Sequence, residues 1–143
     1  MEIKEDYVSM ESAMRLRKLG FDAPTEMCYL IGNKDELISK FGYANHNERN
    51  GCASAPTLNV ALKWLELKYR FAMKIDLANL EDFEKGVAYF KWGYVIYDIV
   101  EKKNGESLVG TGTAIDLDSR GEAMQACVDR ILDIIDEREA QQS

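Results

Sequence analysis

The clearest helical pattern in the chain follows Pro56. Apolar residues recur there at intervals of three and four, which predicts an amphipathic helix with one core-facing stripe. That stripe comprises Leu58, Ala61, Leu62, Leu65 and Tyr69. We expect Ser54 to cap this helix and Pro56 to lie in its first turn. A second stripe, about half a turn away, comprises Val60, Trp64 and Leu67. A helix that is apolar on two sides is usually buried on both, so the second stripe indicates a further contact.

A three-stranded antiparallel sheet is predicted after this helix. The segment "FAMKIDL" (71–77) alternates apolar and polar residues, as a half-buried strand does. "ANLEDFEKG" (78–86) is interpreted as a connector, and "AYFKWGYVIYDIVEKK" (88–103) as a long strand rich in aromatic and β-branched residues. Asn104 and Gly105 are typical of a two-residue hairpin turn, after which "ESLVGTGTAIDL" (106–117) returns.

A turn at Asn104 and Gly105 fixes the predicted register of the last two strands. Lys103 then lies opposite Glu106. On one face the predicted pairs are Ile99 with Gly110, Tyr97 with Gly112 and Val95 with Ala114. On the other face they are Val100 with Val109, Ile96 with Thr113, Tyr94 with Ile115 and Trp92 with Leu117. Large residues opposite glycines leave a shallow surface on which a helix can pack. Because the other face of the sheet is also apolar, we expect both faces to be covered.

The chain ends in a second strongly patterned helix. Ser119 and Glu122 form a capping box at its start. Its apolar stripe, which we expect to pack on the sheet, comprises Ala123, Met124, Cys127, Val128, Ile131, Ile134 and Ile135. Its opposite side is acidic and comprises Glu122, Asp129, Asp133, Asp136 and Glu137. Acidic residues on one exposed helical face are usually solvated, so we expect no metal there.

Shorter elements are predicted before residue 54. Ser9 caps a helix over 10–19 that ends at Gly20. "EMCYLIG" (26–32) is a short strand, and a second strand near 37–43 would complete a hairpin. The polar segment 44–54 is interpreted as a loop. We therefore expect one α+β domain over 1–143, with an N-terminal part (1–53), an α-β-β-β-α unit (54–138) and a frayed tail (139–143).

Charge and composition narrow the function. The net charge of −7 and the isoelectric point of about 4.8 oppose general binding to nucleic acid. Three widely separated cysteines are typical of reduced thiols. The chain has no run of eighteen apolar residues, and "MEIKEDYVSM" lacks the layout of a secretion signal, so we expect a cytoplasmic protein without a membrane segment.

Candidate chemical sites are few. The glycines of Gly110-Thr111-Gly112 precede a strand, whereas a phosphate loop precedes a helix, so we interpret them as packing positions. His46, the only histidine, lies in a polar loop and is expected to be exposed. "KWGYVIYDIV" (91–100) has aromatic residues but few basic neighbours, which favours packing over RNA stacking. We expect no catalytic, cofactor-binding or metal-binding residue and no enzymatic activity.

Two resemblances add to this interpretation. The order helix–strand–strand–strand–helix over 54–138, with "VGTGTAIDLDSRGEAMQACVDRILDII" (109–135), resembles a double-stranded-RNA-binding domain. That family's lysine cluster at the start of the last helix is represented here by Arg120 alone. The segments "RLRKLGFDAP", "SAPTLNVALKWLE" and "EAMQACVDRILDII" resemble, in that order, small uncharacterised proteins of phages and mobile elements of gut bacteria. That group has no established activity, and the resemblance implies an accessory role.

The sequence therefore predicts a small non-enzymatic protein-interaction module. The expected partner is a second copy of the chain or another protein. The predicted contact residues are Val60, Trp64, Leu67, Trp92 and Tyr94. The alternative is a nucleic-acid-binding domain of double-stranded-RNA-binding topology.

Overall fold

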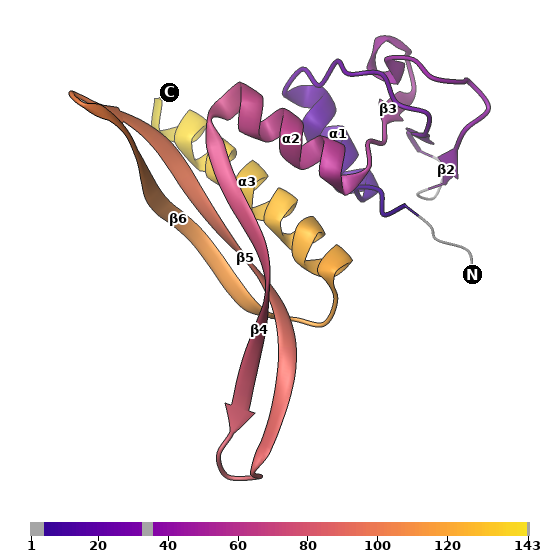
Figure 1. Cartoon of the computed structure of the whole chain (residues 1–143). Helices are drawn as coiled ribbons and strands as arrows, with labels where there is room; N and C mark the ends of the chain where they lie inside the picture. The colour runs from indigo at the N-terminus through magenta and orange to yellow at the C-terminus, as the bar shows by residue number, and fades with distance from the viewer. Residues whose placement is uncertain (1–4, 33–35, 143) are drawn as a thin grey trace. The chain divides into compact units, whose positions relative to one another are not determined.

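The computed structural model describes residues 5–32 and 36–142 of the chain (Figure 1). It is an α+β structure with two three-stranded antiparallel sheets, so the predicted α+β class is confirmed. The chain divides into two compact units, Met1–Trp64 and Leu65–Ser143. The division falls inside a helix, eleven residues after the boundary at 53/54 that the sequence suggested. The single-domain organisation stays a prediction.

The first unit contains a capped helix and a small sheet. Helix α1 (Met10–Lys18) starts at Ser9, whose hydroxyl accepts from the Ser12 N–H at 3.2 Å, and Gly20 follows its end with φ 90°. Strand β1 (Cys28–Leu30) lies between β2 (Leu37–Ile38) and β3 (Cys52–Ser54). The predicted helix and hairpin are confirmed.

The polar segment 44–54 is not the plain loop that we predicted. It contains a short 3₁₀ helix, η1 (His46–Glu48), and the strand β3, whose three residues are all buried. Asn47 explains this order, because its side chain donates to the Phe21 carbonyl and accepts from the Ser54 N–H, both at 2.8 Å. A polar segment can thus be buried when its side chains complete the hydrogen bonds of the backbone.

Helix α2 (Leu58–Tyr69) begins later than the sequence suggested. Ser54 does not cap it, because Ser54 is buried in β3 opposite Cys28. Thr57 takes that place: its carbonyl accepts from the Ala61 N–H at 3.0 Å and its hydroxyl from the Val60 N–H at 3.3 Å. The predicted core stripe is otherwise confirmed, with Tyr69 half-buried and four residues fully buried: Leu58, Ala61, Leu62 and Leu65.

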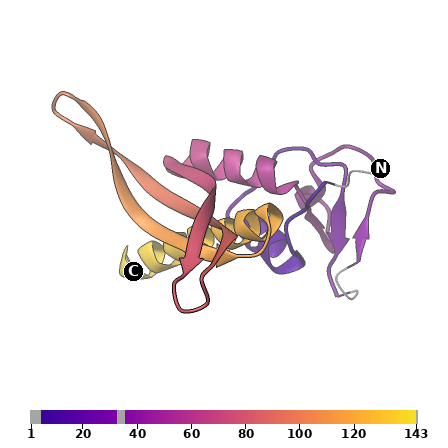
Figure 2. The same cartoon turned by 60° about the horizontal axis from the view of Figure 1, so that its bottom comes forward.

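The second unit is built on one long antiparallel sheet (Figures 1 and 2). Its strands are β4 (Phe71–Asp82), β5 (Val87–Lys102) and β6 (Gly105–Leu117), in the order β4-β5-β6. The connector predicted over 78–86 is mostly wrong, because β4 continues through Asp82. Only a tight turn remains, in which an Asp82 carboxylate oxygen accepts from the N–H groups of Glu84 and Lys85 at 3.1 and 3.2 Å.

The β5–β6 register differs from the predicted one. Lys102 pairs with Gly105, so the turn residues are Lys103 and Asn104, and Gly105 opens the next strand with φ 136°. Seven predicted pairs are therefore wrong: Lys103–Glu106, Ile99–Gly110, Tyr97–Gly112, Val95–Ala114, Val100–Val109, Ile96–Thr113 and Tyr94–Ile115. The observed partners include Tyr97 with Gly110, Ile96 with Gly112 and Tyr94 with Ala114. Two register shifts, each adding a residue on β6, then restore the predicted pair of Trp92 with Leu117.

Helix α3 (Arg120–Gln142) packs on the sheet. The Ser119 half of its predicted capping box is confirmed, since the Ser119 hydroxyl accepts from the Glu122 N–H at 3.1 Å. The Glu122 carboxylate accepts from the Asp118 N–H, also at 3.1 Å, one residue before the cap. All seven predicted stripe residues are buried. At its other end, Arg138 donates to both carboxylate oxygens of Asp98, at 2.9 and 2.6 Å. The helix continues to Gln142, where we expected a frayed tail.

Candidate interaction surface

The structure separates the five predicted contact residues. On α2, Leu67 is 74% exposed and Val60 42% exposed. Trp64 is half-buried, and the centre of its ring lies 5.2 Å from the centre of the Phe21 ring in an edge-on arrangement. Within the second stripe of α2, Trp64 is thus partly covered by Phe21, whereas Val60 and Leu67 are exposed.

The two predicted contact residues of the sheet lie on the face that α3 covers. Tyr94 pairs with Ile75 and Ala114 and is only 7% exposed, and burial raises the pKa of its hydroxyl. Strand alternation puts Trp92 on the same face, where it is half-buried opposite Leu77 and Leu117. Tyr94 is therefore a core residue, and its prediction as a contact residue is corrected.

A larger apolar surface lies on a segment that we interpreted mainly as a connector. Strand β6 ends at Leu117 opposite Trp92, and beyond that pair β4 and β5 continue as two strands alone. We call residues 77–91 the β4–β5 ribbon, which extends past α3 (Figures 1 and 2). It exposes five large apolar side chains: Leu77 (52%), Phe83 (87%), Val87 (53%), Tyr89 (40%) and Phe90 (66%).

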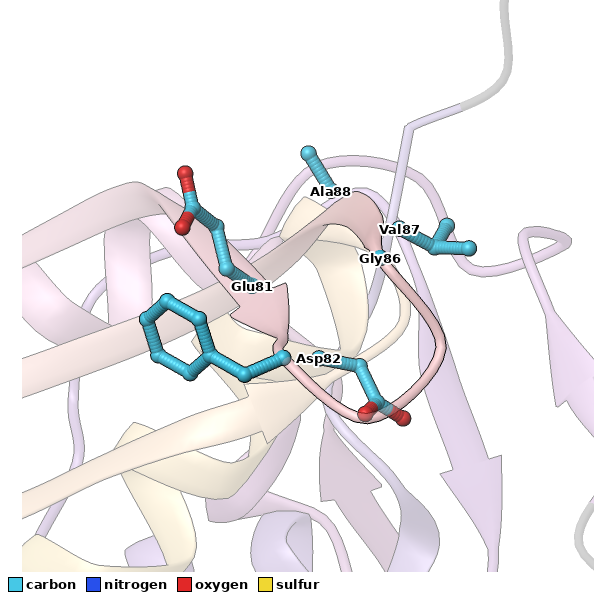
Figure 3. Close-up of a pocket in the computed structure, with 6 residues that line it drawn as sticks. Glu81, Asp82, Gly86, Val87 and Ala88 are labelled. Atoms are coloured by element: carbon cyan, nitrogen blue, oxygen red, sulfur yellow. The ribbon is translucent and has the colours of Figure 1, made fainter.

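The tip of the ribbon contains an open pocket of about 260 Å³ (Figure 3). Its lining residues are Glu81, Asp82, Phe83, Gly86, Val87 and Ala88. The Asp82 carboxylate already holds the backbone of the turn. Small-molecule sites are usually larger, at about 300–1,000 Å³, and enclose most of the ligand. The pocket is therefore smaller than a typical small-molecule site.

The sheet face opposite α3 is apolar as well. Alternation along β5 places Val95, Tyr97 and Ile99 on this face, and Leu108 joins them as the partner of Ile99. Leu108 is 57% exposed, and the other three are half-buried. The sheet therefore has apolar side chains on both faces, as the sequence suggested.

His46 is buried, contrary to the expectation that it is exposed. Its Nε2 lies 2.9 Å from the carbonyl oxygens of both Thr25 and Gly42. Two carbonyl oxygens can only accept, so Nε2 carries the proton and donates to them. Its Nδ1 has no hydrogen-bond partner among the described residues. His46 thus joins two loop segments of the first unit.

Two of the three cysteines, Cys28 and Cys127, are not activated nucleophiles. Burial raises the pKa of the Cys28 thiol, and the neighbouring Cys52 raises it further. Burial likewise raises the pKa of Cys127 to about 12. Because the thiolate is the reactive form, these two thiols are protonated and unreactive at neutral pH.

Two residues on the acidic side of α3 have hydrogen-bond partners on the same helix. Asp129 accepts from the Gln125 amide at 2.9 Å, and Glu137 from Arg130 at 3.1 Å. In the described part of the chain, no three His, Cys, Asp or Glu side chains are grouped so that they could hold a metal ion. No helix within residues 5–32 and 36–142 has both the length and the apolar character to cross a membrane.

Comparisons with known proteins give no information on the family or function of the chain. No protein-family model matches the chain, and neither the curated proteins nor the solved structures contain a match.

Proposed function

We propose that the protein is a non-enzymatic interaction module that associates with a second copy of itself and serves as an accessory protein of a phage or mobile element. The observation that carries this proposal is the β4–β5 ribbon, with five large apolar side chains exposed over fifteen residues. Two-stranded ribbons are marginally stable in water alone. Association with a partner would cover these side chains and stabilise the ribbon.

The chemistry of the ribbon is that of a protein contact. Aromatic side chains are the usual anchors of protein interfaces, because each buries a large area with few rotatable bonds. Phe83 and Phe90 are the most exposed of the ribbon's large apolar residues, at 87% and 66%. Each buried aromatic side chain stabilises a contact by about 1.5–3 kcal/mol through removal of apolar surface from water.

Sedimentation velocity of purified protein over a wide concentration range tests this function. We expect a dimer in the wild type, and at least about a tenfold weaker dimer in Phe83→Glu and Phe90→Glu, since tenfold corresponds to about 1.4 kcal/mol. The matched control is Tyr43→Glu, because Tyr43 is 74% exposed and belongs to the first unit. A wild type that stays monomeric at high concentration, or a dimer that neither ribbon variant weakens, overturns the proposal.

A second candidate, a duplex-RNA-binding domain, is favoured by one observation. The order α2-β4-β5-β6-α3, with α3 packed on an antiparallel sheet, is the order of double-stranded-RNA-binding domains. The charges at the start of α3 oppose it, because Arg120 stands beside Asp118 and Glu122, and Asp118 forms an ion pair with Lys91. Binding of duplex RNA at low salt that falls steeply with added salt would support this candidate, and absence of binding at low salt would exclude it.

A further inference from the structure

Strand β4 is a long and regular edge strand. In the order β4-β5-β6 it is hydrogen-bonded on one side only, to β5. It pairs with β5 from Phe71 to Asp82 without a register shift, whereas the pairing of β6 is shifted twice. Bulges on edge strands discourage pairing with other chains, and long regular edges invite it. Of the two edges of this sheet, β4 is the one suited to receive another strand.

The backbone groups on the free edge of β4 can be assigned. The Arg70 carbonyl accepts from the Ile99 N–H at 3.0 Å, so at this even-numbered position the backbone carbonyl is directed at β5. Backbone groups alternate in direction along a strand, so the even-numbered residues of β4 bond to β5. The odd-numbered residues, among them Met73, Ile75 and Leu77, direct their N–H and C=O groups to the free edge. These groups are available to a strand of a second molecule.

Two charges on β4 select a register for such a pairing. Lys74 and Asp76 are both exposed, and alternation places both on the sheet face opposite α3. Two β4 strands can pair antiparallel about a two-fold axis perpendicular to the sheet. Each side chain of one copy then lies opposite a side chain of the other copy, and both point to the same face of the joined sheet. With Ile75 opposite its own counterpart, Lys74 of each copy lies opposite Asp76 of the other. If the axis passes through residue 74 instead, Lys74 lies opposite Lys74 of the other copy. If it passes through residue 76, Asp76 lies opposite Asp76, and both arrangements are repulsive.

We propose that the second copy associates through this edge, with β4 pairing with β4 of the other copy about a two-fold axis at Ile75. This inference rests on the proposed self-association and adds its surface, symmetry and register. The odd-numbered residues form the hydrogen-bonded pairs. Lys74 and Asp76 then occupy the non-hydrogen-bonded pairs, in which side chains approach most closely. The two sheets join into one continuous sheet with both copies of α3 on the same face.

The same register brings two of the ribbon's exposed apolar side chains, Leu77 and Phe90, next to the second copy. Leu77 is 52% exposed and lies opposite Met73 of the second copy in this arrangement. Asn79, which pairs with Phe90, lies opposite Phe71 of the second copy. Phe71 is covered by α3, with the Arg138 guanidinium 5.4 Å from the centre of its ring. Helix α3 of one copy is thereby brought next to the ribbon of the second copy. Within one copy, α3 does not reach the ribbon.

Charge exchange tests the register. Lys74→Asp and Asp76→Lys each convert two attractive cross-strand pairs into two repulsive ones, so we expect each to weaken the dimer about tenfold in sedimentation experiments. The double variant Lys74→Asp/Asp76→Lys restores both attractive pairs, and we expect its dimer to be as stable as that of the wild type. Both side chains are exposed, so the far-ultraviolet circular dichroism of each variant should match the wild type.

Disulfide formation between two different variants gives an independent readout. We expect an oxidised mixture of Lys74→Cys and Asp76→Cys proteins to form a covalent dimer of one chain of each kind. Each variant alone should cross-link far less, because residue 74 faces residue 76 of the other copy. The native cysteines are buried and serve as the background control.

The possible results separate this inference from the function on which it rests. A dimer weakened by Phe83→Glu or Phe90→Glu but unchanged by both charge variants overturns the β4 pairing and leaves the interaction function standing. A dimer weakened by both charge variants but not restored by the double variant overturns the register. A wild type that is monomeric at all concentrations overturns both proposals.

Discussion

Gly93 is the position at which the sheet should tolerate a side chain least. A Cβ on this residue would lie 2.2 Å from the Ala114 carbonyl oxygen and 2.9 Å from the Ile115 Cα. Both are backbone atoms, so no rotamer change relieves the overlap, and β6 must move away from β5 beside the register shift at Trp92 and Tyr94. Overpacking costs about 1–3 kcal/mol and more when the backbone must shift, so we expect Gly93→Ala to destabilise the protein by about 3 kcal/mol.

Two other glycines of the same sheet supply a graded control. A Cβ on Gly110 would meet nothing within 4 Å, so Gly110→Ala should stabilise the protein by about 0.5 kcal/mol through the lower entropy of the unfolded chain. A Cβ on Gly112 would lie 3.3 Å from flexible side-chain atoms of Arg130 and Ile96, and we expect a cost of about 1 kcal/mol. Urea unfolding followed by tryptophan fluorescence measures all three. Equal stability of Gly93→Ala and Gly110→Ala would refute the close approach of β6 to Gly93.

Three further predictions concern single contacts. Asp98→Asn and Arg138→Met should show a coupling of about 1 kcal/mol in a double-mutant cycle, smaller in high salt, because their paired hydrogen bonds are partly exposed. Cys127 has its pKa raised by burial to about 12 from an ordinary value of 9.0, so its contribution to stability is complete below pH 9 and is lost as the pH rises to 12. Cys127→Ala should make that alkaline loss of stability shallower in pH-dependent urea unfolding. Asn47→Ala should cost about 2 kcal/mol in thermal or urea unfolding, because it leaves a buried backbone carbonyl and N–H without the 2.8 Å hydrogen bonds that Asn47 makes.

The helices were predictable because their signals are local. Ser9 lies directly before α1, and the capping box of Ser119 and Glu122 lies directly before α3. The core stripes of α2 and α3 depend only on spacing along the chain. The start of α2 was missed because Ser54 is a favourable cap by composition but is required in β3, where it pairs with Cys28. That requirement comes from residues distant in sequence.

Register and strand length were less predictable. The predicted turn followed the strong preference of Asn104 and Gly105 for the two central positions of a hairpin turn. The structure places the turn one residue earlier, and a single-residue change alters every pair until the shifts on β6. Similarly, the segment after Leu77 contains Asn79, Glu81 and Asp82, which are typical of a connector. Asn79 and Glu81 are tolerated in β4 because the two-stranded ribbon leaves them exposed, and Asp82 accepts hydrogen bonds from the turn that follows.

The sequence predicted that apolar surface would remain exposed, but it did not predict where most of that surface lies. The sequence indicated apolar residues on both sides of α2 and of the sheet, and exposed residues remain at Val60, Leu67 and Leu108. The largest group lies instead on the ribbon, around Phe83 and Phe90, where no regular periodicity marks it. Such a surface becomes visible only once the length of β6 is known, because the end of β6 leaves the ribbon uncovered.

The alternating charges of β4 distinguish an edge that pairs from an edge that is protected. Edge strands that avoid other chains often carry like charges, bulges or prolines, so that two copies repel or cannot align. Lys74 and Asp76 have opposite signs and stand two residues apart on one face, so two copies of β4 attract each other in one symmetric register and repel in the two neighbouring ones. A protected edge would carry lysine at both positions. If β4 does not pair, Asp76→Lys has no effect on association, whereas pairing of β4 requires that it weaken the dimer and that Lys74→Asp in the same chain restore it.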